Sequence, residues 1–182
     1  LKMIMNHKEE VAKIFANSIG IEDEFEIKLK GLKGQSLSAD NEFDGFGCKG
    51  KNLSPEIQIS NVPKDAKSLA IIVFDPDAPT GGGGWYHWLA INIPTTKTSF
   101  SVGEKNLEKL GLVQTVNSYG TNAFGGACPP IGDKPHRYVF TVYALKVDKL
   151  DLAPTTNPNI TGYNIVANSF TKAETTFSYG RK

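Results

Sequence analysis

Two histidines, two aspartates and a tyrosine lie at the ends of apolar runs, and side chains of these types could bind a ligand together. Asp75 and Asp77 follow the run LAIIVF, His87 opens HWLAINI, and His136 and Tyr138 lie in HRYVFTVYAL. A protonated imidazole donates hydrogen bonds from both ring nitrogens, a carboxylate accepts them, and a phenol does either. These residue types therefore indicate a polar site that could hold an anion or a metal ion, or catalyse a reaction.

Short strands are the elements that would have to position these side chains. The 18 glycines and 10 prolines cluster between short runs of β-branched and aromatic residues, which is typical of many-stranded folds. We predict strands at residues 25–30, 57–60, 69–75, 86–93, 113–118, 137–145 and 173–179. Apolar residues at helical spacing predict two helices, at residues 8–18 and 160–172. One face of the second helix would carry Ile165, Val166, Ser169 and Phe170.

Three of these strands each carry polar residues on the same face as an apolar stripe, because side chains alternate between the two faces of a strand. The expected faces are Leu69, Ile71, Val73, Asp75 and Asp77; His87, Leu89, Ile91 and Ile93; and His136, Tyr138, Phe140, Val142 and Ala144. If the strands pair antiparallel, their polar ends meet at one edge of the sheet. The pattern predicts a small polar pocket above an apolar floor.

The loops expected at this edge are rich in glycine and proline. Residues 81–84 are four glycines, and Gly125 and Gly126 form a pair, so backbone amides could approach an anion without obstruction by side chains. The long loop at residues 119–135 is expected to carry function, because loops of this length in compact domains usually do. We also predict a cis peptide bond between Ala78 and Pro79.

Length and charge exclude several classes of protein. A chain of 182 residues predicts a single domain, residues 1–182, in which residues 1–22 form a helical N-terminal extension. The net charge of +1 provides no basic field for a nucleic-acid partner. No apolar run approaches the roughly 20 residues that cross a bilayer, so we expect no integral membrane segment.

The sequence lacks the motifs that metal sites and hydrolase sites often carry. Histidine and aspartate are adequate ligands for zinc or iron, but no helix-borne metal motif is present. There is no G-x-S-x-G elbow, and no serine or cysteine carries a signature of activation. We therefore expect no metal, no cofactor and no catalytic residue, and we keep hydrolysis of an ester or phosphoester as the weakest alternative.

Six segments together resemble one protein family. They are FDGFGCKGKNLSPEI (43–57), DPDAP (75–79), HWL (87–89), GACPP (126–130), HRYVFTVYAL (136–145) and GYNIVANSFTKAETTFSYG (162–180). This set resembles the phosphatidylethanolamine-binding protein family, and within it the bacterial Raf-kinase-inhibitor-like branch. The resemblance implies a fold dominated by β-structure: a β-sandwich with a large antiparallel central sheet and one or two short helices. It also implies a pocket for phosphate, acetate or phospholipid head groups, formed here by Asp75, Asp77, Trp85, Tyr86, His87, Gly126, Pro130, His136 and Tyr138.

Two features depart from the family pattern. Ala127 stands where bacterial relatives often have proline, which implies a looser rim. Eukaryotic members carry a C-terminal helix beside the pocket, whereas this chain ends at Lys182 soon after its last predicted strand, so more open access is expected.

Three functions remain open on these grounds. The first is a non-enzymatic protein that binds a small anion or a phosphorylated head group through backbone amides, His87, His136 and Tyr138, with Asp75 as a buried acceptor. Its affinity would rise as the pH falls through about 6.5, where imidazole becomes charged. The second is a regulatory protein that binds or inhibits a protein partner, such as a kinase or protease, and the third is the hydrolase. The resemblance also permits a homodimer.

Cys48 and Cys128 leave the compartment open. Both lie in glycine-rich loops that the resemblance places near the pocket, so they could form a disulfide. A disulfide would indicate an oxidising compartment such as a periplasm, whereas free thiols would favour the cytoplasm.

Overall fold

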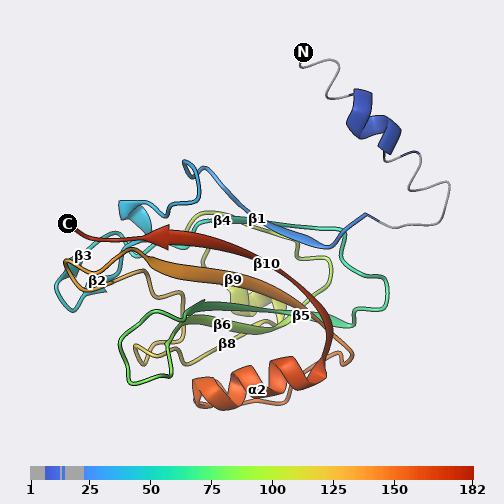
Figure 1. Ribbon diagram of the computed structural model, residues 1–182. Helices are drawn as coiled ribbons and strands as arrows, with labels where there is room; N and C mark the ends of the chain where they lie inside the picture. Colours follow the sequence, from blue (N-terminus) through green and yellow to red (C-terminus); the bar gives the residue numbers. More distant parts are fainter. Residues whose placement is uncertain (1–6, 13, 15–22) are drawn as a thin grey trace.

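The computed structural model describes residues 7–12, 14 and 23–182 (Figure 1). Residues 7–12 and 14 are helical, in agreement with the predicted N-terminal helix wherever that helix is described. Residues 13 and 15–18 of the same prediction lie outside the described residues.

A five-stranded antiparallel sheet forms the middle layer of the molecule (Figure 1). Its strands lie in the order β10 (Ser169–Tyr179), β9 (His136–Leu145), β5 (Ser68–Asp75), β6 (Trp85–Ile93) and β8 (Val113–Thr115). β5 and β6 are almost wholly buried because both faces of the sheet are covered. This explains their nearly continuous apolar sequence, which is typical of strands without a solvent-facing side.

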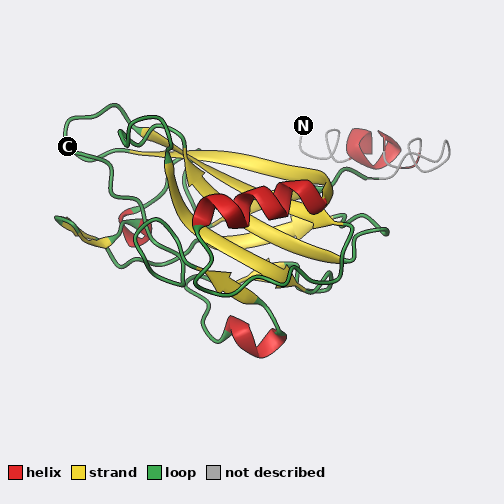
Figure 2. Cartoon of the chain, turned by 90° about the horizontal axis from the view of Figure 1, so that it is seen from below, coloured by secondary structure: helices red, strands yellow, loops and turns green. Residues whose placement is uncertain are grey.

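A smaller sheet covers one face of the five-stranded sheet, and helix α2 (Pro158–Asn168) covers the other (Figure 2). The smaller sheet has the order β1 (Glu26–Lys30), β4 (Glu56–Ser60) and β7 (Ser99–Phe100). Between the two sheets, Ile57 and Phe140 belong to the larger apolar core. On the opposite face, Ile72 belongs to a second core with Ile165 of α2. The predicted fold class, mostly β with a large antiparallel central sheet and few helices, is confirmed.

The shorter elements bring distant loops together. They are the 3₁₀ helices η1 (Ala39–Asn41) and η2 (Leu107–Leu110), and the strands β2 (Asp44–Gly45) and β3 (Cys48–Lys49), which form a small hairpin. The Cys48–Cys128 disulfide, with an S–S distance of 2.04 Å, links this hairpin to the long loop before β9. Cys48 and Cys128 are therefore paired, and the alternative prediction of two free thiols is wrong.

All seven predicted strands are present. Most of their ends agree within one residue, but the strand predicted at 113–118 stops at Thr115, and the last begins at Ser169 instead of Ala173. The two-residue strands β2, β3 and β7 were not predicted, because two residues are too few to show a period.

The predicted second helix is wrong at its C-terminal end. Residues 169–172 belong to β10, and Ser169 pairs with Leu145 of β9. The gain from extending the central sheet therefore outweighs the local helical pattern of this segment. The predicted apolar face is also wrong, since Ile165 is fully buried whereas Val166 is 55% exposed.

The predicted apolar face of β6 is wrong because the strand contains two irregularities. Val73 and Phe74 of β5 pair with Trp88 and Tyr86, so His87 is an extra residue in β6. A second extra residue lies between Ala90 and Ile93, where Asn92 has a φ of 57°. Each β-bulge reverses the alternation of side chains. Leu89 and Ile91 consequently lie in the α2-side core, while Ile93 lies in the core between the sheets.

Candidate functional site

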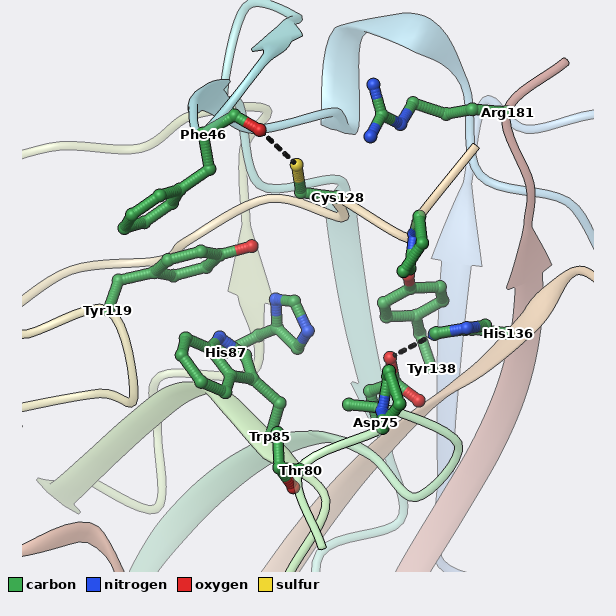
Figure 3. Close-up of a pocket in the computed structure, with 13 residues that line it drawn as sticks. Phe46, Asp75, Thr80, Trp85, His87, Tyr119, Cys128, His136, Tyr138 and Arg181 are labelled. Carbon is green, nitrogen blue, oxygen red and sulfur yellow. Dashed lines mark hydrogen bonds and ion pairs between the residues drawn. The ribbon is translucent and has the colours of Figure 1, made fainter. Parts of the chain in front are cut away.

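The polar ends of β5, β6 and β9 meet at one edge of the central sheet, as predicted. Asp75 pairs with Trp85, and Phe74 pairs with Val139 near the start of β9. A cavity of about 420 Å³ opens at this edge. Its lining includes six of the predicted residues, namely Asp75, Trp85, His87, Pro130, His136 and Tyr138 (Figure 3).

The bulge in β6 helps to place His87 in this cavity. Bulges next to functional sites commonly redirect one side chain, and His87 is the residue added by the bulge. Its ring lies between two phenol rings, with centroids 5.6 Å from Tyr119 and 5.2 Å from Tyr138. The imidazole is 3% exposed, so its state of protonation depends on protein contacts.

His87 is held as a neutral ring. Its Nδ1 lies 2.8 Å from the carbonyl oxygen of Gly125 and 3.1 Å from that of Gly126. Carbonyl oxygens only accept hydrogen bonds, so Nδ1 carries the proton and donates to them. Burial lowers the pKa of His87 to about 4, although the two carbonyls and the charge of Asp75 partly oppose this shift.

His136 is held as a charged ring. Its Nδ1 donates to Oδ2 of Asp75 at 2.7 Å, and its Nε2 donates to Oδ2 of Asp133 at 2.9 Å. Burial disfavours the charged form, but the carboxylates of Asp133 and Asp75 outweigh it and raise the pKa of His136. Both ring nitrogens are thus used within the protein. Of the two rings predicted to donate to a ligand, His136 has no free nitrogen and His87 donates from Nδ1 to the backbone, and their pKa values are shifted in opposite directions.

We expect stability to fall as the pH rises above about 6.5, because the folded-state pKa of His136 lies above its unfolded value. The contribution of the imidazolium is fully present below the unfolded pKa and is lost as the pH rises through the folded pKa. Urea unfolding at several pH values from about 6 to 9 measures this. A His136→Gln variant should have a flatter profile, and equal slopes in the two proteins would contradict the assignment.

Two residues that line the cavity carry a buried hydrogen-bond donor without a partner. The hydroxyl of Tyr138 and Nε1 of Trp85 are buried and have no hydrogen-bond partner among the described residues. Burial raises the pKa of Tyr138 above its usual range, so the hydroxyl keeps its proton. Buried donors usually have partners, so two residues of one cavity whose donors lack a partner are exceptions that need an explanation.

Three predicted pocket residues do not line the cavity. Asp77 faces away and forms a fork with Arg137, accepting from Nε at 3.0 Å and from Nη2 at 2.9 Å, and this contact lowers the pKa of Asp77 to about 2. Tyr86 lies on the opposite face of the sheet against Phe74, because neighbouring side chains in a strand alternate. Gly126 is not among the lining residues, and its carbonyl accepts a hydrogen bond from His87.

The paired glycines do not offer their amides to a ligand. Gly125 N donates to the carbonyl of His87 at 2.8 Å, and Gly126 N donates to Oδ1 of Asn52 at 2.6 Å. A Cβ on Gly126 would lie 2.3 Å from the carbonyl oxygen of Asn41. Glycine is required here for close contact between two backbone segments, so the predicted role of these amides is wrong. The Ala78–Pro79 bond is trans, which corrects the prediction of a cis bond.

Several cavity residues were not among the pocket residues predicted from the sequence. They are Phe46, Ala78, Pro79, Thr80, Tyr119, Cys128 and Arg181. Tyr119 stacks on Phe43 at 3.8 Å and donates to the carbonyl of Gly126 at 2.8 Å. Arg181 donates through Nε to the carbonyl of Pro129 at 2.8 Å, which brings its guanidinium to the cavity. The expected function of the loop at 119–135 and the abundance of aromatic residues around 43–46 and 119–124 were the sequence signals for this wall.

Within the described part of the chain, none of the helices combines the length and the apolar character that crossing a bilayer requires.

Comparison with known proteins identifies relatives along most of the chain. The family model for phosphatidylethanolamine-binding proteins matches residues 33–180. The UPF0098 protein YbcL of Escherichia coli K12 is 45% identical over 160 residues, which cover 85% of this chain and 87% of that protein. YbhB of the same strain is 35% identical over 146 residues, covering 79% and 91% respectively.

Solved structures agree with these matches. The crystal structure of E. coli YbcL, described as a new member of the mammalian PEBP family, matches with a TM-score of 0.82 and 44% identity. The match covers 88% of this chain and 100% of the YbcL chain. A homologue of phosphatidylethanolamine-binding protein from Chlamydia trachomatis matches with a TM-score of 0.73 and 27% identity, covering 87% and 98%. This chain therefore belongs to the phosphatidylethanolamine-binding protein family.

Proposed function

We propose that this protein binds a small oxyanion, either free phosphate or the phosphate of a head group, in the cavity between β5, β6 and β9. The observation that carries the proposal is the pair of buried, unpartnered donors, the hydroxyl of Tyr138 and Nε1 of Trp85. An oxyanion presents several acceptor oxygens and could satisfy both donors at once.

The charges around the cavity support an anionic guest. The positive charge of Arg181 lines the cavity, while the carboxylate of Asp75 is paired with the imidazolium of His136 at 2.7 Å. Asp77 forms its own ion pair with Arg137 outside the cavity. The guanidinium of Arg181 is therefore the charge best placed to attract a ligand at the mouth.

We propose further that the protein is not an enzyme. Asp75 accepts from Asp77 N through Oδ1 and from His136 through Oδ2, and His136 gives both ring nitrogens to carboxylates. Both ring nitrogens of His136 are therefore occupied, so this ring is not free to move a proton to or from a ligand. The use of these groups in hydrogen bonds within the protein favours ligand binding over general acid–base catalysis.

A Tyr138→Phe substitution tests the proposed site. We expect phosphate affinity to fall roughly tenfold or more, because one hydrogen bond to a charged group is lost. The free energy of unfolding should rise by about 1 kcal/mol, because an unpaired buried hydroxyl is removed. Titration calorimetry with inorganic phosphate and urea unfolding measure the two effects.

Tyr143→Phe is the matched control. Tyr143 lies on the same strand but packs against the core on the α2 side. Its substitution removes the same hydroxyl group from the other face of β9 and should leave phosphate binding unchanged. Equal binding by the wild-type and Tyr138→Phe proteins would argue against the proposed site.

We also infer that the protein works in an oxidising compartment, such as a periplasm. The support is the Cys48–Cys128 disulfide, because disulfides persist mainly in such compartments. Cys128 lines the cavity, so the bond also holds part of the binding site in place.

A further inference from the structure

A second cavity lies on the face of the central sheet that carries α2. It has a volume of about 520 Å³, and its floor includes Phe74 of β5 and Val139 and Tyr143 of β9. Helix α2 forms one wall, through Tyr163 and Val166. Figure 2 shows that this single helix lies over only part of the five-stranded sheet. The sheet face beside α2 is therefore a largely apolar groove, which we call the α2 groove.

Helix α2 lacks the charged outer side that a helix on a protein surface usually has. Its sequence, PNITGYNIVAN, contains no charged residue. Ile165 packs in the core, yet Tyr163 is 74% exposed and Val166 is 55% exposed. A helix that is apolar on all sides is normally buried on all sides. We therefore expect a further apolar element to cover the groove beside α2.

The N-terminal helix carries apolar side chains that are themselves uncovered. Within its described part, residues 7–12 and 14, Val11 is 50% exposed and Ile14 is 69% exposed. These two residues lie on the same side of the helix because they are three positions apart, and the sequence continues the spacing with Phe15. Isolated helices shorter than about 12–15 residues are only marginally stable in water. A short helix of this kind therefore gains stability from an apolar partner.

The chain joins the folded body next to the α2 groove. Residues 24–28 line a cavity together with residues 172–175 of β10, the strand at the edge of the central sheet. Glu174 lines both this cavity and the α2 groove, so the two are neighbours across that edge. From Ile14 to Asp23 the chain advances nine residues, which can span up to about 30 Å. Packed sheets lie only about 10 Å apart, so the helix can reach the groove of its own chain around the edge of β10.

We propose that the α2 groove is the docking site for the N-terminal helix of the same chain. In the docked form, Val11 and Ile14 pack against Tyr163 and Val166 and onto the floor of the groove. Removal of these apolar surfaces from water drives the contact. The groove lies on the opposite face of the sheet from the cavity that Asp75 lines, so this inference is independent of the proposed function.

Amide hydrogen exchange at residues 8–12 of the full chain tests this contact. We expect these amides to exchange about tenfold or more slowly than in an unfolded chain, because docking stabilises a helix that is marginal alone. Val166→Asp places a charge in the apolar contact and should reduce the slowing to roughly threefold or less. Val102→Asp is the matched control, since Val102 is also 55% exposed but is not among the residues that line the groove. The control should keep the slow exchange.

A Val11→Ala/Ile14→Ala protein tests the other side of the contact. Alanine favours a helix more than valine or isoleucine does, so a lower helix propensity could not explain faster exchange in this variant. We expect the slowing to fall to roughly threefold or less, because the apolar side chains that enter the groove are shortened.

Three results would overturn the proposal. The first is equal exchange rates in the wild-type and Val166→Asp proteins, which would exclude the groove as the docking site. The second is protection that increases over a roughly tenfold rise in protein concentration, because a contact within one chain does not depend on concentration whereas a contact with a second copy does. The third is protection that requires added phosphatidylglycerol vesicles, which would show that the helix binds a membrane surface instead.

Discussion

Replacing Asp75 with alanine is expected to lower the free energy of unfolding by about 3–5 kcal/mol, because it breaks a buried ion pair from one side. Asp75 is 3% exposed, and its Oδ2 accepts from Nδ1 of His136 at 2.7 Å. Its Oδ1 accepts from the backbone of Asp77 at 2.7 Å. Without the carboxylate, a buried charge and a backbone donor both lose their partner, and the pKa of His136 should fall.

Urea unfolding and an NMR titration of His136 measure these effects. Asp133→Asn is the control, since it removes the other carboxylate on the same ring from a position where the side chain is 41% exposed. Because one partner of this pair is partly exposed, the control should lose less stability than Asp75→Ala. Equal losses of unfolding free energy in the two variants would show that burial of the Asp75–His136 pair does not increase its contribution to stability.

The second large effect is expected from the disulfide. A Cys48→Ala/Cys128→Ala protein should lose about 4 kcal/mol of stability, because the bond closes a loop across 80 residues and restricts the unfolded chain. Urea unfolding with and without a reductant measures the loss. Phosphate binding should weaken as well, because the bond holds the β2–β3 hairpin, and with it Phe46, at the cavity.

The double variant also serves as the control for reduction. A reductant should destabilise the wild-type protein to about the level of the variant and leave the variant unchanged. If thiol labelling of the unfolded wild-type protein without reductant finds two free cysteines, the disulfide and the inferred oxidising compartment are both wrong.

The strands were predictable because their period is local. In β5 the alternation of side chains correctly predicted that Val73 and Asp75 lie on the same face. In β9 it correctly predicted that His136 shares a face with Tyr138 and Phe140. The bulges of β6 were not predictable, because whether an extra residue is accommodated depends on the neighbouring strand. The same holds for the end of α2, where pairing with β9 overrides the helical pattern.

The chemical state of the site was less predictable than its location. His87 and His136 are the same residue type at the same edge of the sheet, yet the pKa of His87 is lowered and that of His136 is raised. Backbone carbonyls surround one ring, and carboxylates hold the other. Asp133, which completes the charged cluster, lies in a loop without any period, so no sequence pattern marked it.

The order of residues along β5 and β9 was sufficient to bring an aspartate, a histidine and a tyrosine to one cavity, because alternation and antiparallel pairing follow from backbone geometry alone. The tertiary structure decided which of them remain available to a ligand. Contacts such as Gly126 with Asn41, Arg181 with Pro129 and Cys48 with Cys128 join segments far apart in the chain. Hydrogen-bond partners and burial determine protonation, and both depend on those long-range contacts.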